Sequence, residues 1–360
     1  MNPLHLLTWF SGNRSKAGPH MTFAKTRASH ALSRTALLLK RQLWIWPIIA
    51  ILVLTIAGYW VRSTIQRTMK LNLHSQLQTL LDVEIAMVDN WRKSQTSNSE
   101  TMANDKRVRE LVYKILSLTQ EDQNPTEDPE AATRSVELPG ALRELRQMLS
   151  PAMTAYDYTD FFLTNRSHKI LASSNSELIG KQGIRVFDEF LQPVMEGGTT
   201  ISPPFSSMTS AVDEFGETRT GLPTMFVCAP VRDDSFQVVG ALAFRMRPEQ
   251  EFTRILQLGR LGESGETYAY NKAGVMVSNS RFDESLILMG IIPDTERSKS
   301  ILNVHLRDPG QDLSSSGRPK VRRSEMPLTK MAAAGTSGRD GVDVEGYRDY
   351  RGVPVIGAWK

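Results

Sequence analysis

Apolar side chains occupy nearly every position of residues 43–61, a run of nineteen residues without a charge. At about 1.5 Å of rise per residue, a helix of this length spans about 28 Å, close to the thickness of the hydrocarbon core of a bilayer. Aromatic residues, which favour the membrane interface, lie near both ends of the run: Trp44, Trp46, Tyr59 and Trp60. The pattern predicts a transmembrane helix over residues 42–62.

A cleaved signal peptide and a buried core helix are the alternatives to a membrane anchor. The apolar region of a signal peptide usually has about 7–15 residues and precedes a cleavage site of small residues. This run is longer and ends in Gly-Tyr-Trp-Val-Arg. Apolar residues also surround the expected helix on all sides, which favours a membrane span over an amphipathic core helix. We therefore expect an uncleaved anchor.

The charges before the run indicate its orientation. Residues 1–41 contain seven Lys and Arg residues and no Asp or Glu. Basic flanks stay in the cytoplasm, so we expect a cytoplasmic tail over residues 1–41 and a domain beyond the inner membrane over residues 62–360. Without those seven, 36 of the 43 basic residues remain against 39 acidic ones. The net charge of +4 thus belongs to the tail and does not predict nucleic-acid binding.

The polar and apolar positions beyond the membrane first follow a helical period. Leucines recur at spacings of three and four within residues 62–94 and predict a long helix that continues as a stalk. A second helix is expected over residues 104–118, a loop over 119–135 and a short third helix over 138–149. Residues 63–150 thus form a stalk and helical section, for which a plain helical bundle is the simpler interpretation.

The pattern then changes to the alternation typical of strands. Residues 158–164 and 169–173 predict a hairpin, residues 186–195 a helix, and residues 224–231 and 238–246 two long strands. After a helix over residues 248–257 the order repeats, with expected strands over residues 267–271, 275–278 and 353–358. The fold class is α+β, with two tandem modules built on antiparallel sheets, over residues 151–248 and 249–360. The single cysteine, Cys228, permits no disulfide within the chain, which favours a bacterial envelope.

Four stretches of this part resemble the double Cache domain, a pair of PAS-like modules in the extracytoplasmic sensors of bacterial transmembrane signalling proteins. They are residues 158–180, 223–252, 259–282 and 341–359. The resemblance is greatest to sensors fused to serine/threonine kinases or to adenylate or guanylate cyclases. It implies a membrane-distal module over residues 151–248 that binds the ligand and a membrane-proximal module over residues 249–360. Family members continue past the position of Trp359 through another strand, so we expect a proximal module truncated at its C-terminus.

The residue patterns of enzymes and metal sites are missing. The glycines at 259, 262 and 265 lack the Gly-Lys-Ser/Thr ending of a phosphate-binding loop, and we interpret them as a turn. His74, His168 and His305 have no metal-ligand spacing, and no serine lies in a Gly-x-Ser-x-Gly elbow. We predict no catalytic residue, metal or cofactor, and therefore no enzyme activity of this chain.

The resemblance also indicates where a ligand lies, between the distal sheet and the segment that covers it. Amino-acid-binding members of the family have an aspartate in the last distal strand, which pairs with the ligand ammonium. Arg245 occupies that position here, and Ser207 lies near the position of a second family aspartate. Arginine holds carboxylates with two parallel hydrogen bonds, so we hypothesise that a small organic acid binds near Tyr158, Asp160, Ser207 and Arg245. The alternative is that Arg245 forms a structural salt bridge.

The sequence thus predicts a membrane-anchored small-molecule sensor. A homodimer is expected because the leucine stripe of the stalk continues from the membrane helix, although this stripe also suits packing on the distal module. A non-sensory binding or scaffolding protein of the envelope remains an alternative function. The chain also fits the N-terminal part of a receptor serine/threonine kinase or cyclase.

Overall fold

The computed structural model describes residues 45–119, 130–259, 262–295, 297–315, 317, 319 and 321–360. The chain divides into two compact units, residues 1–69 and residues 70–360. The predicted basic tail and the first residues of the predicted membrane span lie outside the described residues.

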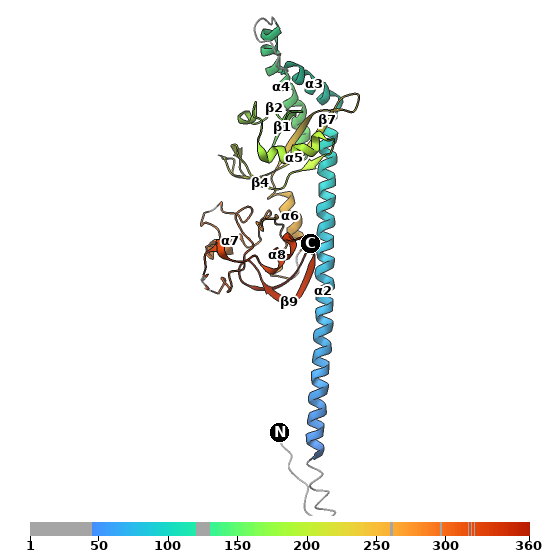
Figure 1. Cartoon of the computed structure of the whole chain (residues 1–360), viewed down its shortest axis with the longest axis vertical. Coiled ribbons are helices and arrows are strands. Elements are labelled where there is room, and N and C mark those ends of the chain that lie inside the picture. The colour runs from blue at the N-terminus through green and yellow to red at the C-terminus, as the bar shows by residue number, and fades with distance from the viewer. Residues whose placement is uncertain are drawn as a thin grey trace, which may run out of the picture. The chain divides into compact units, whose positions relative to one another are not determined.

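One helix, α2 (Ile45–Ala103), contains the described part of the predicted span and the whole predicted stalk (Figure 1). Its residues from Ile45 to Val61 are all exposed. Within the described ranges, α2 is the one helix long and apolar enough to cross a membrane. Later in α2 five residues are buried: Glu84, Gln95, Ser99, Met102 and Ala103. The last third of the helix therefore packs as part of a folded domain.

Two further helices follow, α3 (Lys106–Leu118) and α4 (Glu130–Ala155). The Asp105 carboxylate caps α3 by accepting hydrogen bonds from the first free backbone N–H groups of the helix. Because α4 begins at Glu130, the loop predicted over residues 119–135 is wrong in its last part, and the helix predicted over residues 138–149 is too short. Burial of Leu145 and Leu149 outweighs the backbone hydrogen bonds that prolines inside α4 remove.

The largest sheet, here called the large sheet, has six antiparallel strands. In order they are β2 (Ile170–Ser173), β1 (Asp160–Asn165), β8 (Val238–Met246), β7 (Pro223–Arg232) and β3 (Thr200–Ile201), with β4 (Phe205–Ser206) also paired to β7. The predicted hairpin and the two predicted long strands are confirmed. Gly240 lets β8 approach β1 closely, because a Cβ at this position would overlap the backbone carbonyl of Thr164.

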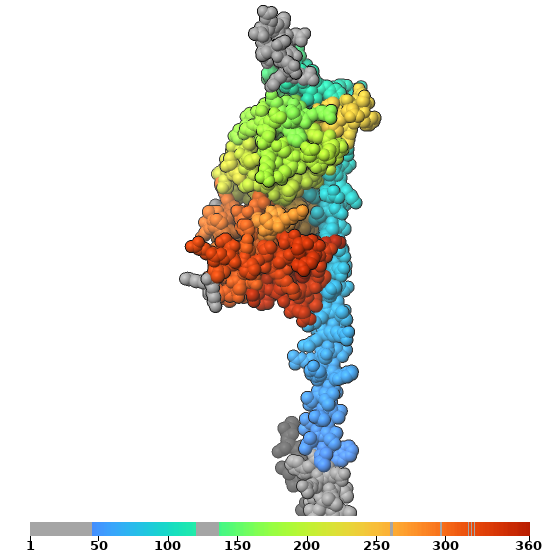
Figure 2. All heavy atoms as spheres, viewed as in Figure 1, coloured from blue at the N-terminus to red at the C-terminus, as the bar shows by residue number. Residues whose placement is uncertain are grey.

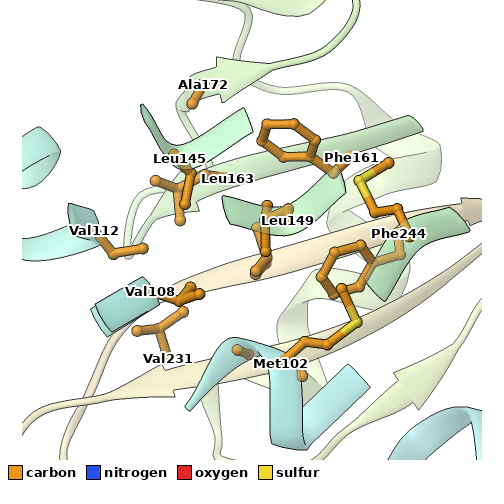
Figure 3. Packing of buried hydrophobic residues seen from close by; sticks show 14 of the residues in the cluster. Met102, Val108, Val112, Leu145, Leu149, Phe161, Leu163, Ala172, Val231 and Phe244 are labelled. Carbon is orange, nitrogen blue, oxygen red and sulfur yellow. The ribbon is translucent and has the colours of Figure 1, made fainter. Parts of the chain in front are cut away.

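Each face of the large sheet carries its own apolar cluster. On one face Leu163 and Phe244 pack with α3, α4 and the end of α2 (Figure 3). On the other face Phe162 and Phe226 pack with α5 (Arg185–Met195), a helix that the sequence predicted. Neighbouring residues of a strand point to opposite faces, so both clusters follow from the alternation within the strands. A short helix, η1 (Ser176–Leu178), and a small hairpin of β5 (Ala211–Val212) and β6 (Thr218–Arg219) lie between the main strands in sequence.

The remaining residues, 251–360, are here called the C-terminal region (orange to red in Figure 2). Its elements are α6 (Glu251–Leu258), α7 (Asp283–Leu288), η2 (Arg323–Glu325), α8 (Lys330–Thr336), β9 (Gly341–Arg348) and β10 (Pro354–Trp359). The strand predicted near its end is confirmed as β10, which pairs with β9. The strands predicted over residues 267–271 and 275–278 form only in part: the two segments pair through the bridge Tyr270–Met276 and through backbone hydrogen bonds from Val277 to Ala269 and from Asn271 to Val275, but they do not extend into regular strands. The backbone of Met276 also bonds to Leu302 and Val304.

Helices and antiparallel sheets are therefore combined as the sequence predicted, and one long apolar helix precedes them. The division into two sensory modules remains a prediction.

Candidate functional site

A cavity of about 160 Å³ lies on the face of the large sheet that packs against α5. We call it the Arg245 cavity. Part of its wall comes from strands β1, β7 and β8, part from α5, and part from residues 205–211, which cover the sheet. This is the place where the sequence predicted a ligand.

Phenylalanine rings form the apolar wall of the Arg245 cavity. The Phe162 ring stacks on Phe187 at a centroid distance of 5.1 Å and meets Phe226 edge-on at 5.0 Å. Phe205 contributes a fourth ring, 6.1 Å from Phe226. Rings packed on one another in this way hold a fixed shape, so the wall favours a compact apolar group.

Arg245 forms the polar end of the cavity and is only 3% exposed. Its Nη1 donates to Asp160 Oδ2 at 3.1 Å, and its Nε and Nη2 donate to Thr224 Oγ1 at 3.2 and 3.1 Å. The register of the sheet makes the ion pair, because Asp160 and Arg245 lie opposite each other on β1 and β8. A guanidinium carries five N–H groups. Three serve these bonds, and the other two have no hydrogen-bond partner among the described residues.

The covering residues are tied to η1 and the residue before it by hydrogen bonds. Asn175 Nδ2 donates to the carbonyl of Ser210 at 2.7 Å, and the Ser210 N–H donates to Glu177 Oε2 at 3.2 Å. Ser207, which lines the cavity, donates from Oγ to the carbonyl of Thr209 at 2.6 Å. This hydrogen bond stabilises the covering loop. The hydroxyl oxygen of Ser207 can still accept a hydrogen bond.

The structure brings Asp160, Ser207 and Arg245 together at one cavity and places Tyr158 elsewhere. Tyr158 lies in the cluster on the opposite face of the sheet, where its ring stacks on Phe244 at 5.1 Å. Its hydroxyl donates to Gln95 Oε1 of α2 at 2.7 Å, and burial raises the pKa of the phenol. In a strand, residues 158 and 160 would lie on the same face. They do not, because β1 begins only at Asp160, after a turn in which Asp157 has a φ of 56°.

Gln95 connects three elements through its amide. It accepts from Tyr158, and its Nε2 donates to Glu251 Oε2 at 3.0 Å. Trp91 Nε1 of α2 donates to the same carboxylate oxygen at 2.8 Å. Helix α2, the residues before β1 and the first residue of α6 therefore share one polar contact, which is partly buried.

Sequence reasoning missed several polar residues of the cavity, and two of them, Thr224 and Lys181, bear on its charge. Thr224 holds the guanidinium, and alternation from Phe226 along β7 would have placed it on the correct face. Lys181 lines the cavity with an exposed side chain for which no ion pair occurs among the described residues. No sequence signal distinguishes Lys181 from other surface lysines, because it follows η1 in a loop.

Within the described parts of the chain, no group of three or more His, Cys, Asp and Glu residues could hold a metal ion. His168 bonds through Nδ1 to Asp188 Oδ1 at 2.7 Å. Cys228 is fully buried in the sheet, and burial raises the pKa of its thiol. The buried thiol is thereby kept in its unreactive, protonated form.

A scan against models of protein families found no match to the sequence, and no curated protein matches it. Parts of the chain are similar to solved sensor domains. The sensor domain of the histidine kinase DctB from Vibrio cholerae is 15% identical with a TM-score of 0.33, over 54% of this chain and 61% of that one. The chain thus spans less than two thirds of that domain.

Two chemoreceptor domains are similar at the same level. The ligand-binding domain of Tlp3 from Campylobacter jejuni, in complex with 4-methylisoleucine, is 14% identical with a TM-score of 0.38, over 62% of this chain and 74% of that one. The ligand-binding domain of PctB from Pseudomonas aeruginosa PAO1, in complex with L-Arg, is 14% identical with a TM-score of 0.35, over 57% and 64%. TM-scores this low support no conclusion about the fold or the function of this chain. The functional proposal therefore rests on the cavity itself.

Proposed function

We propose that this chain is a membrane-anchored sensor that binds a small carboxylate in the Arg245 cavity. The buried guanidinium of Arg245, with two N–H groups left over beside an aromatic wall, is the observation that carries the proposal. Arg245 and Lys181 together bring two positive charges against the single negative charge of Asp160. An ammonium ligand would add to this positive charge, whereas a carboxylate balances it.

The size of the cavity limits the ligand. A protein cavity of about 150 Å³ holds a benzene molecule, and the Arg245 cavity measures about 160 Å³. The proposed ligand therefore has on the order of six to nine non-hydrogen atoms. Its carboxylate lies at Arg245, and its apolar part lies against Phe162, Phe187 and Phe226.

Binding can reach the rest of the molecule through two contacts. Ala211 of β5 lines the cavity, and the β5–β6 hairpin is joined to the C-terminal region by Arg297, whose Nη1 lies 2.6 Å from Glu217 Oε2. On the opposite face the Gln95 contact joins the residues before β1 to α2. A ligand shifts the equilibrium between two conformations of a protein only if it binds one of them more tightly. Here that difference in affinity would come from closure of residues 205–211 over the ligand.

The test uses the full chain in lipid nanodiscs and three probes that share one carbon skeleton: isovalerate, isovaleramide and isopentylamine. We expect isovalerate to raise the melting temperature and isovaleramide to leave it unchanged, whereas any effect of isopentylamine should be independent of Arg245. A ligand at one hundred times its Kd adds about 2.7 kcal/mol to the stability of the folded state. Stabilisation by isopentylamine alone would refute the proposal.

The variants are chosen so that the fold survives. The double variant R245Q/D160N removes both charges of the buried pair, so it leaves neither without its partner. We expect this variant and K181Q to bind isovalerate less tightly, and the exposed-lysine control K93Q to bind it as the unchanged chain does. Isovalerate binding that is unaltered in R245Q/D160N would also contradict the proposed site.

The orientation in the membrane is part of the same proposal. The exposed apolar residues of α2 between Ile45 and Val61 support a single membrane span, with the N-terminus in the cytoplasm and residues 62–360 in the periplasm. A reporter enzyme fused after Lys360 tests this orientation. Activity of a reporter that works only in the cytoplasm would contradict it. We expect the sensor to act as a homodimer on a kinase or cyclase output domain.

A further inference from the structure

Two neighbouring cavities of about 400 and 330 Å³ lie between α2 and the C-terminal region, both within residues 70–360. The same six residues line both of them: Leu81, Glu84, Thr267, Tyr268, Tyr270 and Lys360. Neither shares a lining residue with the Arg245 cavity. The C-terminal region therefore has a separate space in which a small molecule fits.

Glu84 is the polar centre of this space. Its side chain lines both cavities, the residue is only 2% exposed, and its Oε1 has no hydrogen-bond partner among the described residues. Burial raises the pKa of this carboxyl group to about 7, although a hydrogen bond from Thr267 opposes part of the rise. Gly259 packs so closely against the carboxylate that a Cβ there would overlap it. A buried carboxylate without a partner is costly unless a positive charge joins it.

Aromatic rings surround the larger cavity, which we call the Glu84 cavity. Tyr268, Tyr270, Tyr347 and Trp359 all line it. The Tyr347 and Trp359 rings meet edge-on at 6.1 Å, and Trp359 Nε1 donates to the carbonyl of Arg339 at 2.9 Å. The Tyr270 hydroxyl, like Glu84 Oε1, is buried without a hydrogen-bond partner in the described structure. Ring faces attract cations, most strongly when water is excluded.

Two ion pairs hold most of the other charges on the Glu84 cavity. Arg351 lies 2.7 Å from Asp349, and its guanidinium stacks 4.0 Å above the ring of Phe282. Lys360 lies 3.8 Å from Asp82. In each of these ion pairs the positive and negative charges balance.

Two further carboxylates and one lysine complete the surroundings. Glu266 accepts hydrogen bonds from Tyr350 at 2.9 Å and from Ser280. Asp89 and Lys272 line only the smaller cavity, and Asp89 lies 3.4 Å from Arg92. Glu84 is thus the carboxylate on the larger cavity that has neither a cation nor a full set of hydrogen bonds within the described residues.

We propose that the Glu84 cavity binds a small organic cation, a primary or quaternary ammonium ion, with Glu84 as its counter-ion. The tyrosine rings and Trp359 surround the ammonium group, and the Tyr270 hydroxyl can accept a hydrogen bond from a primary amine. The site goes beyond the carboxylate site at Arg245 and does not depend on it, because the two ligands have opposite charges and occupy separate cavities.

The experiment uses the full chain in nanodiscs, with choline and its neutral isostere 3,3-dimethylbutan-1-ol as probes. We expect choline to raise the melting temperature and the alcohol to leave it unchanged. Glu84→Gln keeps the shape and removes the charge, so this variant is expected to fold and to bind choline at least about tenfold more weakly. Glu110→Gln, the same change at an exposed position of α3, is the matched control.

Two further measurements separate the proposal from a purely structural role of Glu84. Choline does not titrate, so its affinity should rise between about pH 6 and pH 8 as Glu84 loses its proton, and the rise should be absent in Glu84→Gln. Tyr270→Phe should weaken a primary amine such as isopentylamine more than it weakens choline. Equal stabilisation by choline and the alcohol, unchanged choline binding in Glu84→Gln, or no binding of either cation at millimolar concentration would each overturn the proposal.

Discussion

Replacing Glu84 by glutamine in the ligand-free protein tests whether a buried charge destabilises the fold. Burial raises the pKa of this carboxyl group from 4.5 to about 7, so the folded protein holds the proton more tightly than the unfolded chain. Below about pH 4.5 both states are protonated and the group has no effect on stability. Between about pH 4.5 and pH 7 the unfolded state loses the proton first, which favours unfolding as pH rises. Above pH 7 the cost is complete.

The size of the effect follows from the shift. From 4.5 to about 7 the pKa moves by roughly 2.5 units, and each unit corresponds to about 1.36 kcal/mol, which gives about 3 kcal/mol. Glutamine has the shape of the protonated carboxyl group and does not ionise. The Glu84→Gln variant should therefore match the unchanged protein near pH 4 and exceed its stability by about 3 kcal/mol at pH 8.

The assay is urea unfolding of both proteins in nanodiscs, followed by tryptophan fluorescence at several pH values. Only the difference between the two free energies of unfolding is used, because burial also raises the pKa of Glu249, Glu266 and Asp283. A difference that stays constant from pH 4 to pH 8 would refute the reasoning, since it would mean that Glu84 does not titrate in this range.

Three other changes test the large sheet and its contacts. Arg245→Gln alone leaves the carboxylate of Asp160 without its cation and should lower the free energy of unfolding by about 2 kcal/mol or more, whereas adding Asp160→Asn should restore most of it; no restoration contradicts the buried pair. Gly240→Ala forces β1 and β8 apart and should cost about 3 kcal/mol in urea unfolding, while Gly140→Ala, which has open space inside α4, should cost nothing; equal effects count against the close approach. Arg297→Gln should change stability by less than about 1 kcal/mol but speed hydrogen exchange in the β5–β6 hairpin, and unchanged exchange shows that this contact does not hold the hairpin.

Local patterns predicted the large sheet well. The alternation along β8 placed Leu242 and Phe244 on one face and Ala241 and Ala243 on the other, and the two apolar clusters contain them in this way. A strand's alternation depends only on its own backbone, so it can be derived without knowing the partner strand. The same rule failed at Tyr158, because that residue precedes the strand and follows a turn.

The C-terminal region was harder to predict because its contacts are not local. Residues 267–271 and 275–278 pair with each other only over a short stretch, and Met276 also bonds to the backbone of Leu302 and Val304. These backbone contacts join segments that are distant in the sequence, and a short sequence pattern does not encode such contacts. The burial of Glu84 could not be predicted from a local pattern either, because it depends on contacts with Gly259 and Thr267, which are distant in the sequence. A glutamate in a stalk pattern would otherwise be expected to face water.

Of the candidate site, the sequence predicted the position of the pocket and three of its polar residues. It left open whether Arg245 binds a ligand or forms a structural ion pair, and the guanidinium forms that pair while keeping two N–H groups. Only the register between β1 and β8, which places Asp160 opposite Arg245, shows the contact. The aromatic wall needed α5 and the covering residues in three dimensions.

The shared contact at Gln95 sets how α2 can move. The bonds that join Trp91 and Gln95 to Glu251, and Tyr158 to Gln95, measure 2.8, 3.0 and 2.7 Å. Sliding α2 along its axis by one residue, about 1.5 Å, would break all three at once. Small graded displacements of α2 against the sheet are therefore resisted. A signal that passes this point must either carry α2, α6 and the start of β1 together as one rigid piece or jump to a second set of partners, and only the latter gives an all-or-none response.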